Sequence, residues 1–129
     1  MKKLFLIILP LLLCASCAEP FKEINPSEFN AKIALRTDIK SPEDLVLLYF
    51  DYPENEAKPE LQITTKSLQN DSFEVTLIHT KLEDDSMEGE KIILTAKLSK
   101  QQWIVTEIKR NWRCWKDRGH ISWGIESCS

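Results

Sequence analysis

Beyond its first residues, the chain has its most continuous apolar run between Leu45 and Phe50, directly after the sequence Ser-Pro-Glu-Asp. A serine hydroxyl, a proline at the first helical position and acids in the first turn are signals for the start of a helix. We therefore expect a helix that begins at Ser41 and ends before Pro53, because proline lacks the amide hydrogen and strains the residue ahead of it. Its residues are apolar almost all round, so we expect most of its surface to be buried.

After the helix the apolar positions alternate with polar ones, which is the period of a β-strand. Four such runs occur, at Leu61–Thr65, Phe73–Leu77, Ile92–Leu98 and from Trp103 onward, with short turns at Gln69–Asp71 and Ser99–Gln101. The pattern predicts a four-stranded antiparallel meander. On the last run we expect Ile104, Ile108 and Trp112 to lie on the face opposite Trp103 and Val105, so that both faces are partly covered.

The stretch before the helix gives weaker signals. Residues 18–26 are polar and contain two prolines, as in a linker. In residues 27–39 the apolar positions fit either a helical stripe or a short strand, and we favour the helix. The chain has no internal repeat and no second long apolar run, so we predict one α+β domain over residues 27–129, with a helix packed on the sheet.

The N-terminus has the pattern of an export signal. Two lysines are followed by ten apolar residues, Leu4–Leu13, which are too few to cross a bilayer that needs about 20. The next residues, Cys14-Ala15-Ser16-Cys17, resemble the bacterial lipobox, in which small residues precede a cysteine that is lipidated after cleavage. This resemblance implies acylation, by chains such as palmitate, at Cys17. Cutting before Cys14 would place the large Leu13 at the cleavage point.

The lipobox resemblance departs from the usual pattern at Cys14, where leucine is common, and an ordinary secreted protein cut near Ala18 is the alternative. With cleavage before Cys17, residues 1–16 are a signal peptide and 17–26 a lipidated tether that joins the domain to a membrane. Lipoproteins of Gram-negative bacteria that stay in the inner membrane commonly carry Asp after the cysteine. Ala18 therefore implies the outer membrane, on its periplasmic side.

Removal of the signal changes both the charge and the cysteine chemistry. The 17 basic residues fall to 15 against 20 acidic ones, so the formal charge moves from −3 to −5, which argues against a nucleic-acid partner. Only Cys114 and Cys128 then remain as free sulfurs, and in an oxidising compartment we expect them to form a disulfide. The same bond argues against zinc bound by Cys114, His120 and Cys128, and against a Cys-His nucleophile.

The order of a helix, four strands and a final hairpin with Trp103 just after its turn resembles the cystatin-like and nuclear-transport-factor-like superfamily, over residues 41–112. The resemblance implies a pocket between helix and sheet, and its members include enzymes and simple binding modules. Beyond it, the segment from Cys114 to Cys128, with Arg118-Gly119-His120 between tryptophans, resembles a C-terminal segment of uncharacterised secreted bacterial proteins. That resemblance implies no activity.

The C-terminal segment also holds most of the candidate binding residues. They are Trp112, Arg113, Trp115, Arg118, His120 and Trp123. In one interpretation the segment is a structural flap, whose tryptophans cover the sheet edge and whose Arg118 and His120 hydrogen-bond to its own carbonyls. In the other it is a recognition surface, because tryptophan stacks on sugars or side chains and arginine binds carboxylates in two-pronged fashion.

Elsewhere the candidates are fewer. His79 shares a face with Val75 and Leu77, where it either lines a pocket or is a hydrogen-bonded residue at the core edge. The acids of Glu83–Glu90 lack the spacing of a calcium loop, and a solvated hairpin loop explains them. We expect a non-enzymatic binding module for an envelope protein or glycan, with no cofactor, no metal and no catalytic residue. The alternatives are a small hydrolase or isomerase that uses a pocket acid or His79, and a purely structural envelope protein.

Overall fold

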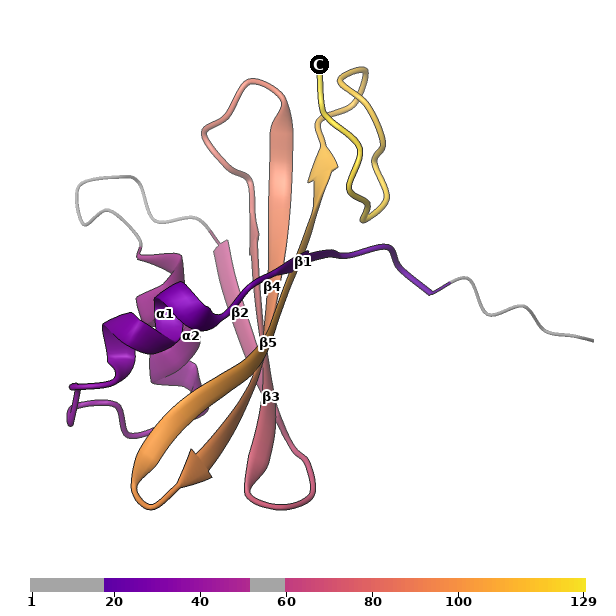
Figure 1. The fold of residues 1–129 in the computed structure, drawn as a ribbon. Coiled ribbons are helices and arrows are strands. Elements are labelled where there is room, and N and C mark those ends of the chain that lie inside the picture. The colour runs from indigo at the N-terminus through magenta and orange to yellow at the C-terminus, as the bar shows by residue number, and fades with distance from the viewer. Residues whose placement is uncertain (1–17, 52–59) are drawn as a thin grey trace, which may run out of the picture.

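The computed structural model describes residues 18–51 and 60–129, and these form a twisted five-stranded antiparallel sheet with two helices on one face (Figure 1). The predicted signal peptide, Cys14, Cys17 and Pro53 lie outside the described residues. The elements are β1 (Lys22–Ile24), α1 (Ser27–Ile33), α2 (Pro42–Phe50), β2 (Glu60–Ser67), β3 (Ser72–Thr80), β4 (Met87–Ser99) and β5 (Gln102–Cys114). The strand order is β1-β5-β4-β3-β2, and the predicted α+β class is confirmed.

Helix α2 begins where the sequence predicts. The Asp44 amide donates to the Ser41 hydroxyl at 3.3 Å, and the Ser41 amide donates back to the Asp44 carboxylate at 3.1 Å, which completes a capping box. The helix ends at Asp51, whose left-handed backbone lets its amide bond to the Leu47 carbonyl. The expected burial of most of its surface is confirmed, because Leu45 and Val46 are fully buried and Leu48–Phe50 are partly buried against the core; Leu47, 43% exposed, is the exception.

Strands β2 to β5 form the predicted meander, and local turn chemistry explains its tight hairpins. The connection from β2 to β3 covers residues 68–71 and ends with Asn70 and Asp71, and Lys100 and Gln101 join β4 to β5. All four residues have positive φ, which is the requirement of the two-residue turns that match the twist of a hairpin. The turns predicted at Gln69–Asp71 and Ser99–Gln101 are therefore confirmed.

The predicted count of four strands is wrong, because the stretch expected to be a linker contributes β1. Lys22 and Ile24 pair with Arg110 and Ile108 of β5, so the sheet has a fifth strand at its edge. The prolines on either side of this short strand, and its lack of an alternating pattern long enough to detect, hid it in the sequence. Immediately after it, α1 confirms the helix favoured for this region, although only as far as Ile33.

The predicted face for Ile108 and Trp112 is also wrong. Val105 pairs with Ala96, but the next pair is Glu107 with Thr95, so β5 has one extra residue at Thr106. Such a bulge moves the side chains that follow it to the face of the sheet opposite the one that simple alternation predicts. Ile108 therefore lies on the same face as Trp103 and Val105, where it is 1% exposed.

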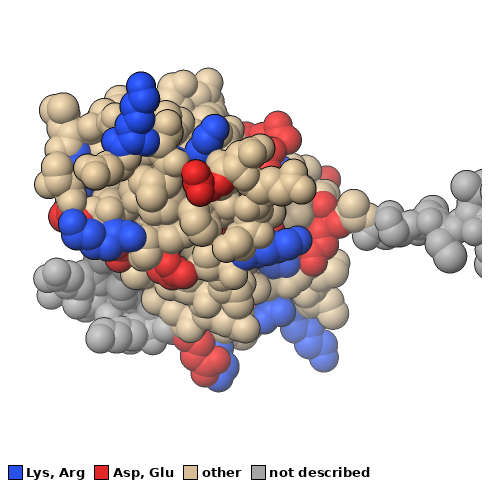
Figure 2. Space-filling model, turned by 90° about the horizontal axis from the view of Figure 1, so that it is seen from below, with Lys and Arg blue, Asp and Glu red and all other residues tan. Residues whose placement is uncertain are grey.

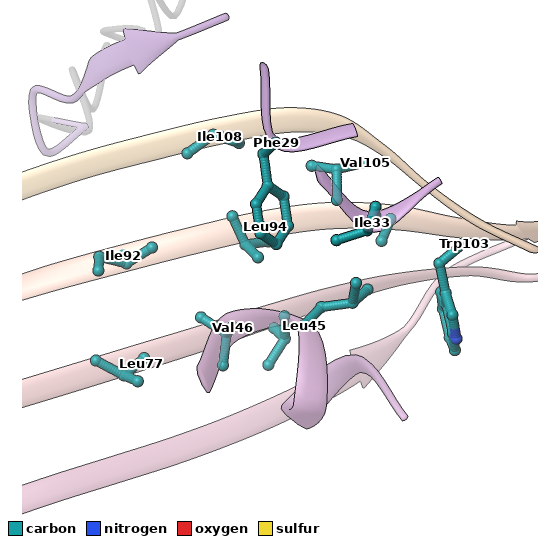
Figure 3. Packing of buried hydrophobic residues seen from close by; sticks show 12 residues of the cluster. Phe29, Ile33, Leu45, Val46, Leu77, Ile92, Leu94, Trp103, Val105 and Ile108 are labelled. Atoms are coloured by element: carbon teal, nitrogen blue, oxygen red, sulfur yellow. The ribbon is translucent and has the colours of Figure 1, made fainter. Parts of the chain in front are cut away.

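The hydrophobic core fills the space between the helices and this face of the sheet (Figure 3). Leu45 and Val46 of α2 and Phe29 and Ile33 of α1 pack against the side chains of the central strands. The strand residues of the core are Val75, Leu77, Ile92, Leu94, Ala96, Trp103, Val105 and Ile108. Neither helix of the described residues covers the opposite face, and the strand residues between these positions are polar or partly exposed.

Charges of both signs are intermixed over the face shown in Figure 2, without a basic patch on that side. Neither α1 nor α2, the two helices among the described residues, is long and apolar enough to cross a bilayer.

Candidate functional site

The candidate site is the segment from Trp115 to Ser129, which we call the flap; it lies beside the end of β5 (Figure 1). Cys114, the last residue of β5, forms a disulfide with Cys128, with 5.5 Å between their Cα atoms. This confirms the predicted bridge. The sulfur atoms lie near His120, but they are bonded to each other and offer no thiolate to a metal.

Backbone hydrogen bonds hold the flap in one conformation. The Trp112 amide donates to the Gly124 carbonyl at 2.9 Å, and the Gly124 amide donates back to the Trp112 carbonyl at 2.8 Å. The Cys114 amide donates to the His120 carbonyl at 2.8 Å. Gly119 has φ 142°, and a Cβ at this position would lie 2.8 Å from the Cys114 sulfur. Only glycine suits such a position, because both the backbone conformation and the space exclude a side chain.

His120 is enclosed by the flap. Its Nδ1 lies 2.8 Å from the Ser122 carbonyl oxygen, and its Nε2 lies 2.8 Å from the Glu126 carbonyl oxygen. Carbonyl oxygens only accept hydrogen bonds, so both contacts are satisfied when both ring nitrogens carry a proton. The two carbonyls, Ser122 first, thus raise the pKa of His120 above its usual value. The imidazolium form therefore links the Ser122 carbonyl to the Glu126 carbonyl within the flap.

The three tryptophans of this region differ in their surroundings. The Trp112 indole donates to the Glu126 carbonyl at 2.9 Å, and the Trp115 indole donates to the Asp84 carbonyl at 2.8 Å, which fastens the flap to the β3–β4 loop. Trp123 lies on the face of the sheet opposite the helices. There the Lys91 ammonium and the Arg113 guanidinium lie 4.6 and 4.8 Å from the centre of its ring, at cation–π distance.

The flap and the adjoining end of β5 therefore combine both interpretations of this part of the sequence. Trp112, Arg113, His120 and Trp123 make internal contacts, and the Arg113 guanidinium also pairs with Glu88. The outward residues are Trp115, Ile121 and Ile125, which are 37%, 70% and 39% exposed, together with the exposed Lys116 and Arg118. A shallow groove of about 230 Å³ runs beside Trp115, Lys116 and Ile121.

A second polar cluster lies at the edge of the core. The Glu90 carboxylate accepts from the Arg110 guanidinium at 2.5 Å and lies 3.1 Å from His79 Nε2. His79 is 4% exposed and stacks edge-on against Phe50, with ring centres 4.5 Å apart. Among the described residues, no polar atom pairs with His79 Nδ1. His79 is thus a residue of the core edge, held by an acid.

The sequence interpretation missed this cluster because it assigned Glu90 to a solvated loop. That assignment is wrong for Glu88 and Glu90, which belong to β4. The missed signal was the alternation itself: Glu90 lies two residues before the buried Ile92 and four before Leu94, so it shares their face.

An open groove of about 300 Å³ lies between α1, β1 and the end of α2. Ile24, Phe29 and Ile108 form its apolar floor, and Glu28 and Lys32 stand at its rim. Tyr49 closes one side, and its burial raises the pKa of its hydroxyl. No residue predicted as a binding residue lines it.

Comparison with models of protein families, with curated proteins and with solved structures gives no match to this chain.

Proposed function

We propose that this chain is a lipid-anchored lipoprotein of the bacterial cell envelope, whose flap binds a partner protein without catalysis. The disulfide between Cys114 and Cys128 is the observation that carries the proposal. Structural disulfides belong to oxidising compartments, so the bridge agrees with the export signal of residues 1–16. The lipobox-like sequence supplies the anchor at Cys17 and, with Ala18 after it, favours the periplasmic side of the outer membrane.

The flap suits recognition because it is ordered before a partner arrives. The disulfide, the enclosed His120 and the indole of Trp115 all restrict it. Binding to a loop of fixed conformation costs less entropy than binding to a mobile one. Its outward side also presents apolar residues, Ile121 foremost, next to a groove, and central apolar contacts carry most of the energy of protein interfaces.

A protein partner fits this surface better than a glycan. Sugar binding needs an open aromatic face, but Trp112 and Trp123 already lie against Arg110 and against the pair of Lys91 and Arg113. The outward residues are Trp115, whose indole nitrogen is already bonded to the Asp84 carbonyl, and the branched aliphatic Ile121 and Ile125. Lys116 and Arg118 are exposed beside them. A partner segment with apolar and acidic side chains complements such a surface.

The finer fold assignment is also a proposal. We infer that the domain is related to the cystatin-like superfamily, and the succession of α2 and the meander β2–β5, with the helix on one face, supports this. β1 and α1 are additions before that unit.

The second candidate function is a small hydrolase or isomerase. The pair of His79 and Glu90 favours it, because a histidine beside a carboxylate is a common acid–base arrangement. Against it, Glu90 is also paired with Arg110, and His79 is 96% buried and is not among the residues that line the groove beside Tyr49. We therefore rank it below the binding module.

The test replaces Ile121 with a photo-crosslinking amino acid in intact cells, with Leu35 as the matched control. Leu35 is an apolar residue that is 95% exposed and follows α1, away from the flap. We expect one discrete adduct from position 121 and none from 35, and we expect Lys116→Glu to abolish the adduct. Identical adducts from both positions, or none from position 121, would contradict the proposed partner site.

The anchor is tested separately. Cys17→Ser should release the protein from the membrane fraction, and mass spectrometry of the native protein should find acyl chains on its N-terminal peptide. Unchanged membrane association of the variant, without acyl groups on the native protein, contradicts the anchor.

A further inference from the structure

The chain packs onto the sheet almost immediately after Cys17. The Lys91 ammonium donates to the Glu19 carboxylate at 2.7 Å, and the Asn111 side-chain amide donates to the Pro20 carbonyl at 3.1 Å. Asn111 is fully buried and Lys91 is 11% exposed, so this is an integral part of the fold. One residue, Ala18, separates Cys17 from Glu19. Two peptide units span about 7 Å at most, which is the whole length of the tether.

These contacts lie on the face of the sheet that α1 and α2 do not cover. Lys91 and Asn111 are paired with each other across β4 and β5. Ile92, next to Lys91, and Ile108, three residues before Asn111, face the core on the other side. The first described residues accordingly run away from the sheet on the side opposite the helices (Figure 1). The ring of Phe21 lies 6.0 Å from the Lys91 ammonium, on the same face.

We propose that this surface rests on the lipid headgroups of the membrane to which Cys17 is anchored, with α1 and α2 facing away from it. We call it the anchor-side surface; Glu19, Phe21, Lys91 and Trp123 lie on it, around the buried Asn111. The inference rests on the proposed lipidation of Cys17. It adds an orientation, which lipidation alone does not give.

The length of the tether carries the argument. The headgroup region of a bilayer is about 5–8 Å thick on each side, so a tether of about 7 Å keeps Glu19 at its outer boundary. Because Glu19 and Pro20 are fixed to the sheet, the domain cannot swing freely about the anchor. Tryptophan is enriched at membrane interfaces, so the partly exposed Trp123 suits this place.

The orientation also places the flap near the membrane. Cys114 lies three residues beyond Asn111 on β5, a distance of about 10 Å along the strand. The partner proposed for the flap is therefore a protein at the membrane surface. The groove beside Tyr49, on the helix side, faces away from the bilayer.

The experiment uses the acylated protein in vesicles of phosphatidylethanolamine and phosphatidylglycerol that contain a lipid with a nitroxide on its headgroup, which quenches nearby tryptophans. The key variant has a flexible Gly-Ser segment of about ten residues between Ala18 and Glu19, with a mean span of about 17 Å. It leaves every contact of the domain unchanged. Trp123→Phe removes the tryptophan of the anchor-side surface. Trp103→Phe is its matched control, because Trp103 is buried and lies about 25 Å along β5 from Asn111.

We expect the headgroup nitroxide to quench the unaltered protein, the inserted segment to abolish most of this quenching, and Trp123→Phe to reduce it. Trp103→Phe should leave it unchanged. If the acylated protein and the acylated insertion variant are quenched equally, the orientation is wrong while the anchor stands. If mass spectrometry finds no acyl chain, the anchor itself fails, and the orientation fails with it.

Discussion

Replacing both Cys114 and Cys128 with alanine removes the covalent bond that closes the flap. The two residues are 14 positions apart, and opening a loop of that length should lower the free energy of unfolding by about 3 kcal/mol, because the unfolded chain gains entropy. Alanine leaves no unpaired polar group in place of Cys114, which is 3% exposed. The hydrogen bonds between Trp112 and Gly124 also remain. The loss should therefore stay close to the loop-closure value, a large part of the roughly 5–15 kcal/mol of a typical domain.

The assay is equilibrium unfolding of the exported domain in guanidinium chloride, followed both by tryptophan emission and by far-UV circular dichroism. The double variant should unfold at a lower midpoint by both probes. The unaltered protein, measured with a thiol reductant, is the matched control, because it loses the same bond without any change of sequence.

Two results would refute this reasoning. A loss of less than about 1 kcal/mol would mean that loop closure contributes little to this fold. Two free thiols in the native exported protein, measured with Ellman's reagent, would mean that the bridge does not form.

Two further predictions concern charged groups. The pKa of His120 is raised in the folded state, so its stabilising contribution is complete below the ordinary value of 6.5 and is lost as the pH rises through the folded value. As the pH rises through that value, the melting temperature of the unaltered protein should therefore fall relative to that of His120→Gln. Parallel pH profiles of the two melting temperatures would contradict a protonated His120. Glu90→Gln leaves Arg110 without its carboxylate and should cost about 1–3 kcal/mol in guanidinium unfolding. Glu60→Gln, which breaks an exposed pair with Lys81, should cost no more than about 1 kcal/mol, and equal losses for the two variants would contradict the importance of burial.

Local chemistry explains the features of the fold that were predicted correctly. The capping box at Ser41 and Asp44 involves residues three positions apart, so the start of α2 is written in the sequence. The turn residues of the tight hairpins tolerate positive φ, and the strands beside them alternate clearly. The disulfide was predicted because cleavage and lipidation at Cys17, if they occur as expected, leave only Cys114 and Cys128 to pair.

The predictions that failed concern register and edges. A single extra residue at Thr106 moved Ile108 to the core face, and no local signal marks a bulge there. β1 is three residues long and exists because β5 offers an unpaired edge. The pairing of Glu90 with His79 and Arg110 depends on three strand positions brought together by that register.

By itself, then, the sequence determined the elements whose cause lies within a few residues: the helix cap, the hairpin turns and the alternating strands. Only the tertiary structure decided which candidate residues turn outward. Trp115 and Ile121 remain accessible, whereas the ring of Trp123 is covered by the cations of Lys91 and Arg113 from β4 and β5. The physical reason is that exposure and pairing depend on neighbours distant in sequence, and a periodic pattern contains no information about them.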